Sequence, residues 1–101
     1  METVLKPVHA GDILFEEFMK PYNITAYRLS QITGMSQTQI GRIIKGKRSV
    51  TVDTALRLAQ VFNTSPEFWL NIQNRYDIDS MNAETKECIK QIQPIKDCVF
   101  A

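Results

Sequence analysis

Two short amphipathic segments, separated by a glycine, constrain this chain more than any other feature of its sequence. Between Ala26 and Ile32 the apolar residues recur at three-residue spacing, which predicts a helix with one inward face. Gly34 interrupts this pattern, as a residue that tolerates positive φ does at a helix C-terminus. Ser36 then offers a side-chain cap for a second helix over residues 37–44. The stretch therefore predicts a helix-turn-helix whose second helix enters the major groove of DNA.

Positive charge is concentrated around the second of these helices. Residues 28–57 contain six of the 12 Lys and Arg residues of the chain but only one of its 11 Asp and Glu residues, Asp53. The formal net charge of the whole chain is only +1, so this excess is local, and contact with phosphate requires such a cluster. Helix pairs also occur in many domains that never meet nucleic acid, and spacing alone leaves that alternative open. The charge distribution favours DNA binding.

The outward positions of the second helix carry the side-chain types that read bases. A glutamine can form two hydrogen bonds to an adenine edge, a threonine can contact a thymine methyl group, and an arginine can pair with a guanine. The predicted base-reading residues are Gln37, Thr38, Gln39 and Arg42. The predicted phosphate-binding residues are Ser36, Lys45, Lys47 and Arg48, with Arg28 and Tyr27 as further candidates from the preceding helix. The alternative for each of them is a solvated polar side chain of the surface.

Three further helices are predicted around this pair. The first begins near Gly11 and is stopped by Pro21. The fourth follows Thr51 as an N-cap and ends at Asn63, a residue that tolerates the left-handed conformation. Its apolar residues at core spacing are Val52, Ala55, Leu56, Leu58, Ala59 and Phe62. The fifth starts at the sequence Ser-Pro-Glu beginning at Ser65 and is apolar on more than one side.

These signals predict one all-α domain with two flanking segments. Residues 1–10 are expected to form an extended N-terminal arm, residues 11–78 a five-helix DNA-binding domain, and residues 79–101 a C-terminal extension with a short amphipathic helix over residues 83–93. No apolar run approaches the ~20 residues that a membrane helix needs. The N-terminus has no basic segment followed by an apolar one, so no secretion signal is expected.

Residues that carry catalysis or bind metals are sparse. His9 is the only histidine and lies in the predicted arm, with no acid or base expected beside it. No nucleophile or acid–base pair is recognisable, so the chain is predicted not to be an enzyme. Cys88 and Cys98 lack the further ligands of a zinc site, and without a secretion signal they are expected to be reduced thiols rather than a disulfide. No metal or cofactor is predicted.

The apolar fifth helix has two interpretations. Its large side chains either complete one crowded core or form the contact between two copies of the chain. Helix-turn-helix proteins usually bind two half-sites as dimers, and Trp and Tyr are favoured as interface anchors. The predicted homodimer interface consists of Phe68, Trp69, Ile72 and Tyr76.

A resemblance to a known family is carried by the run LSQITGMSQTQIGRIIKGKR and the residues around it. The chain resembles the Cro/repressor-type helix-turn-helix family and, more narrowly, HigA-type antitoxins, also called virulence-associated protein I. The sequence HAGDIL resembles that family's His-Pro-Gly-Glu opening, with alanine and aspartate in place of the usual proline and glutamate. The block GKRSVTVDTALRLAQVFNTSPEFWLNIQ resembles its middle, and Gln73, Tyr76 and Asp77 resemble its ending. The similarity covers about residues 8–78.

The resemblance implies a Cro/repressor-like domain and a homodimer that binds a palindromic operator in its own promoter. It implies as partner a HigB-type toxin, a ribosome-associated RNA-cleaving protein that the chain neutralises. Gln37, Thr38 and Arg42 match the base-reading positions of the wider family. The implied location is the bacterial cytoplasm, on the nucleoid and not at a membrane. Two alternatives stay open: a stand-alone regulator without a toxin, and a protein-interaction module with vestigial DNA binding.

Overall fold

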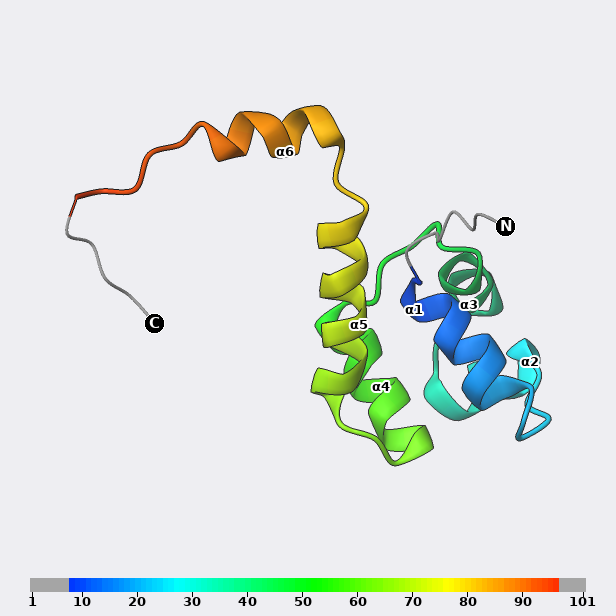
Figure 1. Cartoon of the computed structure of the whole chain (residues 1–101). Helices are drawn as coiled ribbons and strands as arrows, with labels where there is room; N and C mark the ends of the chain where they lie inside the picture. Colours follow the sequence, from blue (N-terminus) through cyan, green and yellow to red (C-terminus); the bar gives the residue numbers. More distant parts are fainter. Residues whose placement is uncertain (1–7, 97–101) are drawn as a thin grey trace.

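The computed structural model describes residues 8–96 and builds them from helices (Figure 1). In chain order these are α1 (Ala10–Ile13), which continues as the π-helical segment η1 (Leu14–Met19), then α2 (Ala26–Thr33), α3 (Gln37–Ile44), α4 (Val52–Phe62), α5 (Pro66–Asp79) and α6 (Ala83–Lys90). None of the described residues forms a strand. The all-α class is thereby confirmed, with α6 as a helix inside the predicted C-terminal extension.

The starts and ends of the helices follow the local sequence. Side-chain hydroxyls accept a hydrogen bond from a backbone N–H of the first turn at each of the expected caps, Thr25, Ser36, Thr51 and Ser65. Each such cap satisfies one of the backbone donors that a helix leaves unpaired at its start. Gly34 ends α2 with φ of 80°, and Asn63 ends α4 with φ of 56°, so both take the left-handed conformation. These predictions are confirmed.

The helices from α1 through α5 share one hydrophobic core. Its buried apolar residues are Ala10, Leu14, Met19, Leu29, Met35, Ile40, Ile43, Val50, Ala55, Leu58, Ala59 and Trp69. Figure 1 shows α4 and α5 side by side as an antiparallel pair, with α2 and α3 on the other side of α1 and η1. Phe18 of η1 packs against the α4–α5 pair, because its ring centroid lies 4.9 Å from that of Phe62 and 5.1 Å from that of Trp69.

The inward faces of α2 and α4 differ from the predicted ones. Ile32 is 47% exposed, and the buried position at the end of α2 is instead Thr33, whose hydroxyl donates to the Leu29 carbonyl oxygen at 2.7 Å. Val52 and Leu56 were expected in the core but are 60% and 54% exposed. They lie four residues apart and therefore share an edge of α4 that no other helix covers. The prediction that they are core residues is wrong, because it rested on their apolar character alone.

The boundary of the predicted N-terminal arm also needs correction. Ala10 is buried and is the first residue of α1, and the Nδ1 atom of His9 caps this helix by accepting from the Gly11 backbone N–H at 3.0 Å. A side chain at Gly11 would overlap the backbone carbonyl of Ile43, so α1 packs directly onto α3. Any arm therefore ends before His9, since His9 and Ala10 are part of the folded domain.

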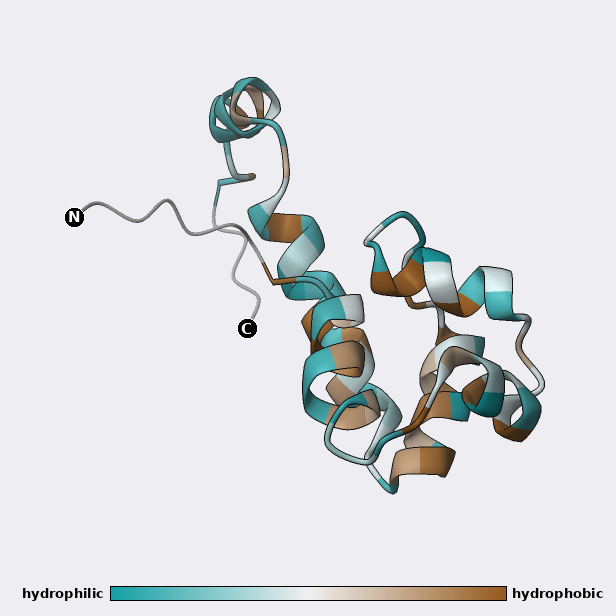
Figure 2. Ribbon diagram, turned by 90° about the vertical axis from the view of Figure 1, so that its right-hand side faces the viewer, coloured by the Kyte–Doolittle hydropathy of each residue, from teal (hydrophilic) through white to brown (hydrophobic). Residues whose placement is uncertain are grey.

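The C-terminal extension stands apart from this core. Figure 2 shows α6 as a mostly hydrophilic helix away from the other helices, and none of its residues is buried. The radius of gyration is 17.0 Å, compared with about 13 Å for a compact domain of this length. Cys88 is exposed on α6, and Cys98 lies outside the described residues. Within residues 8–96 no helix has the length and apolarity to cross a membrane.

Candidate nucleic-acid interface

Helix α3 turns one face to the core and the other to solvent. Ile40 and Ile43 are buried, whereas Gln37, Thr38 and Arg42 are exposed. The residues of the outer face border one shallow, open groove, which is lined by Gln37, Thr38, Gly41, Arg42, Lys45 and Lys47. Gly41 has no side chain to fill this groove, and a Cβ atom added there would project into open space, with nothing within 4 Å. Most of the predicted base-reading side chains therefore share one accessible surface with two cations.

Gln39 differs from the other predicted base readers. It is half-buried and is absent from the lining of the groove. Its backbone N–H donates to the Ser36 hydroxyl at 3.0 Å, so the residue lies in the capped first turn. Gln39 can reach a ligand only at the border between the outer face and the core.

The predicted phosphate-binding residues lie at three places. Lys45, Lys47 and Arg48 are exposed at the end of α3 and on the loop that follows it. Ser36 is exposed at the start of α3, where its oxygen already accepts the capping bond and its hydroxyl hydrogen can still be donated to an anion. The other two candidates, Tyr27 and Arg28, are exposed on the first turn of α2 and do not border the α3 groove.

Arg57 has a structural role that its positive charge alone does not indicate. Its Nη1 donates to the Thr33 carbonyl oxygen at 2.6 Å and its Nε to Asp53 at 3.0 Å. The Thr33 carbonyl is at the C-terminal end of α2, where helix carbonyls have no partner within the helix. Arg57 thus fixes α4 against the turn between α2 and α3. Its four-residue spacing from Asp53 is visible in the sequence, whereas the bond to Thr33 is a tertiary contact.

The expected interface residues of α5 do not form one surface. Trp69 is completely buried in its own subunit, and its indole N–H donates to the Thr64 hydroxyl at 2.8 Å. The prediction that Trp69 anchors a dimer is therefore wrong, because it has no exposed area left to bury. Phe68 remains partly exposed, and Ile72 borders an open apolar groove with Val8 and Ile13.

Tyr76 is also engaged within the subunit. It is half-buried, and its ring meets the His9 ring edge-on with 5.6 Å between the centroids. The Nε2 atom of His9 lies 3.4 Å from a carboxylate oxygen of Asp12, so the expectation of no acid beside His9 is wrong. His9 and Asp12 lie three positions apart in the sequence, a spacing that brings two side chains together at the start of a helix.

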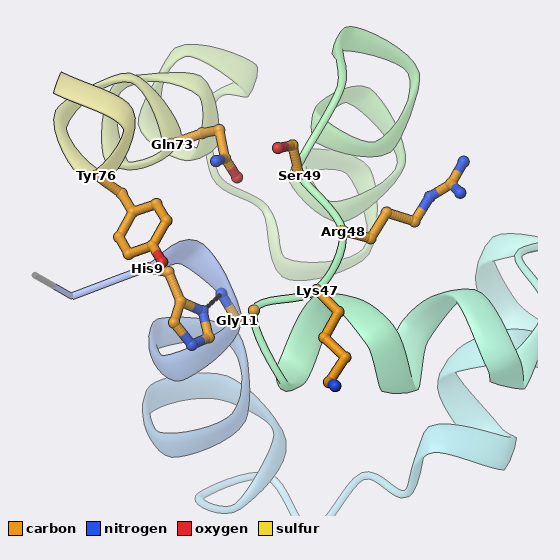
Figure 3. A pocket seen from close by; sticks show the side chains of 8 residues that line it. His9, Gly11, Lys47, Arg48, Ser49, Gln73 and Tyr76 are labelled. Atoms are coloured by element: carbon orange, nitrogen blue, oxygen red, sulfur yellow. Dashed lines mark hydrogen bonds between the residues drawn. The ribbon is translucent and has the colours of Figure 1, made fainter. Parts of the chain in front are cut away.

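A small pocket of about 80 Å³ lies where α1, the loop after α3 and α5 meet (Figure 3). Its lining is His9, Gly11, Gly46, Lys47, Arg48, Ser49, Gln73 and Tyr76. Figure 3 shows the side chains of Lys47 and Arg48 extending away from Gln73 and Tyr76. The two ends of the domain, which are far apart in the sequence, therefore meet directly behind the loop that carries these two cations.

No cluster of three or more potential metal ligands occurs among residues 8–96.

Comparisons with known proteins agree with this geometry. A family model for helix-turn-helix proteins matches residues 15–69. Virulence-associated protein I of Dichelobacter nodosus is 38% identical to the chain over 88 residues, which are 87% of this chain and 81% of that protein.

Two solved structures extend the agreement to three dimensions. The antitoxin HigA of Pseudomonas aeruginosa, solved with the higBA promoter, superposes with a TM-score of 0.82 at 31% identity and covers 89% of this chain and 99% of that one. An addiction module antidote protein of the HigA family from Coxiella burnetii superposes with a TM-score of 0.79 at 39% identity and covers 90% and 100%. The similarity therefore extends over almost all of the described residues.

Proposed function

Because the chain belongs to the helix-turn-helix family, among HigA-type antitoxins and virulence-associated protein I, we propose that it represses its own operon by reading an operator with α3. Membership of this family makes it a DNA-binding regulator and antitoxin, not an enzyme. In this role α3 lies in the major groove, and its neighbouring cations contact the phosphates on either side.

The observation that carries this proposal is the division of α3 into two faces. Burial of Ile40 and Ile43 fixes the rotation of the helix about its axis, and this rotation leaves Gln37 and Arg42 in the open groove. These two side chains can form bidentate bonds to adenine and guanine edges, which specify sequence. Lys45 and Lys47 supply charge that holds the duplex without reading it.

The test of base reading is a DNA titration with Gln37→Ala. We expect a loss of about 1–3 kcal/mol on the cognate operator and a relaxed preference at one base position. Gln91→Ala is the matched control, because Gln91 is also an exposed glutamine but lies at the end of α6, away from α3 and from both proposed dimer surfaces. Cognate affinity and selectivity that are the same for both variants would show that α3 does not read bases.

The proposed assembly is a homodimer on a palindromic operator, since two half-sites require two recognition helices. Two surfaces of the subunit can make this contact: the groove at Ile72 of α5, and the exposed edge of α4 formed by Val52 and Leu56. Sedimentation of Ile72→Glu and Leu56→Glu distinguishes them, because a buried charge in the true interface dissociates the dimer. An unchanged mass for both variants, or a monomeric wild-type protein, would contradict this assembly.

The proposed protein partner is a HigB-type toxin that contacts the N-terminal part of the chain, where the DNA-reading face of α3 stays free. Glu16 and Glu17 of η1 are exposed there and can attract a basic partner. Co-purification tests this contact with two variants, one that lacks residues 1–8 and one with Glu16→Gln and Glu17→Gln, and unchanged toxin capture by both rules it out. A stand-alone regulator is the alternative, to be recognised by the absence of a toxin reading frame beside its own. The expected place of action is the bacterial cytoplasm.

A further inference from the structure

The loop between α3 and α4, residues 45–51, is the part of the candidate interface that is not helical. Lys47 and Arg48 are exposed on it. A loop that moved freely would have to be ordered when its cations met phosphates, and this ordering weakens binding. Whatever holds the loop in place before DNA arrives therefore strengthens every contact that its cations make.

Gln73 of α5 holds the C-terminal end of this loop. Its Oε1 accepts from the Val50 backbone N–H at 2.8 Å, across 23 residues of sequence. Its Nε2 donates to a carboxylate oxygen of Asp77 at 2.9 Å, which fixes the amide with its oxygen toward the loop. Gln73 is only 7% exposed and its bond with Val50 is buried, so water competes little for that bond, whereas the bond with Asp77 is partly buried.

His9 holds the other end. Gly46 turns the chain after α3 with φ of 76°, and a Cβ atom added there would lie 2.9 Å from the Nε2 atom of His9. The imidazole is kept in this position by the Gly11 N–H on one side of its ring and by contact with Tyr76. Tyr76 and Gln73 lie three residues apart on α5 and therefore share a face, so one face of α5 supports both ends of the loop (Figure 3).

We propose that Gln73 is a positioning residue for DNA binding, which holds the loop so that Lys47 and Arg48 meet the phosphates in place. The proposal rests on the phosphate-binding role proposed for these two cations. Gln73 itself is not expected to touch DNA, because it lies behind the loop and is buried by it. It acts through the backbone of Val50.

Gln73→Leu tests the proposal, because it removes both hydrogen bonds without a change of charge. We expect operator and unrelated duplexes to bind about tenfold more weakly, a loss of about 1.4 kcal/mol, close to the cost of ordering one loop residue. We also expect the slope of log affinity against log salt to fall by about one to two, as the phosphate contacts of Lys47 and Arg48 are lost. The ranking of operator sequences should stay as in the wild type. The Val50 amide should exchange its hydrogen faster.

Thr64→Val is the control for a purely structural effect. It removes the hydrogen bond from Trp69 at the opposite end of α5 and lowers stability without touching the loop. Assayed below its melting temperature, it should bind DNA with the wild-type affinity and salt slope. If it shows the same loss as Gln73→Leu, reduced stability explains both variants and the positioning role is overturned.

The double variant with Gln73→Glu and Asp77→Asn provides a rescue at constant net charge. The new carboxylate can accept from Val50 as the wild-type amide oxygen does, and the new amide can donate to that carboxylate, so both bonds are kept and only the bond between positions 73 and 77 reverses its direction. We expect the wild-type salt slope to return. Gln73→Asn, which keeps the amide but is one methylene too short to reach Val50, should behave like Gln73→Leu and replaces it if the leucine variant does not fold.

The outcomes separate the two proposals. Wild-type protein that binds no operator in a salt-dependent way refutes the proposed function and the positioning role with it. Wild-type protein that binds, together with folded Gln73→Leu or Gln73→Asn at the same affinity and slope, overturns the positioning role alone. Failure of the double variant to restore the slope overturns it as well.

Discussion

Helices α3 and α5 both carry several large apolar residues, but only α3 is oriented by its own sequence. In α3 these residues fall on one side, so that burying Ile40 and Ile43 leaves a single polar face outside. In α5 they surround the helix, and Trp69 is buried while Phe68, the next residue before it, stays partly exposed. The orientation of a helix with one apolar face can be predicted from its sequence, whereas the orientation of a helix with apolar residues on several sides depends on the helices that pack against it.

The contrast between the two helices predicts its largest effect at Trp69. Trp69→Ala should lower the free energy of unfolding by about 3–5 kcal/mol, because it leaves a cavity among Phe18, Phe62 and Phe68. Phe68→Ala, which removes a partly exposed ring, should cost clearly less. Chemical denaturation of both variants measures the difference. A stable Trp69→Ala variant that failed only to dimerise would restore Trp69 to the interface and erase the contrast.

Gly11 of α1, which packs against α3, sharpens the comparison on the α3 side. Gly11→Ala places a methyl group against the backbone of Ile43 and should destabilise the protein by about 1–3 kcal/mol, as overpacking does. Thermal unfolding measures this loss of stability. Wild-type stability of Gly11→Ala would mean that α1 does not pack on α3 as described.

Lys47→Ala tests whether the loop after α3 belongs to the DNA-binding face. Affinity should fall alike for all duplex sequences, and the salt slope should fall by about one, because one phosphate contact is lost. Lys90→Ala, on α6 away from the core, serves as the charge-matched control and should change neither quantity. Equal losses of affinity for both variants would mean that DNA binding depends only on the net charge and not on the position of Lys47 in the loop after α3.

Gly41→Ala has the smallest expected effect and opposite signs in two assays. The protein should become more stable by about 0.5–1 kcal/mol, since alanine favours a helix over glycine and nothing lies within 4 Å of the new methyl group. DNA affinity should nevertheless fall, because the methyl group stands in the groove that is proposed to meet the base edges. A gain in stability with unchanged operator affinity would mean that this face does not approach DNA closely.

Much of the fold could be predicted because its signals are local. Caps such as Ser36 and Ser65 accept from backbone groups three residues away, and Gly34 ends α2 through its own φ. The candidate site followed from the same kind of signal, since alternation of apolar and polar positions along α3 separates an inner from an outer face. Such features depend on neighbours within one or two turns, and the sequence states those neighbours directly.

The misplacements have a common cause. Val52 and Leu56 have the spacing of core residues, but no helix covers their edge of α4. Arg57 has the charge of a phosphate binder, but the Thr33 carbonyl lies within its reach. The environment of each residue is supplied by a segment distant in the sequence, and one-dimensional spacing contains no information about that segment.

The sequence by itself determined α2 to α5, their caps and the side of α3 that faces outward, because these depend on backbone caps and on a period of 3.6 residues. Only the tertiary structure decided that Trp69 is interior and that His9 and Gln73 line one pocket behind the loop of Lys47 and Arg48. Contacts between residues 23 or more positions apart, such as that of Val50 with Gln73, form only when packed helices bring them within hydrogen-bond distance. Local sequence signals thus select the surface that is proposed to meet DNA, and long-range packing holds that surface in shape.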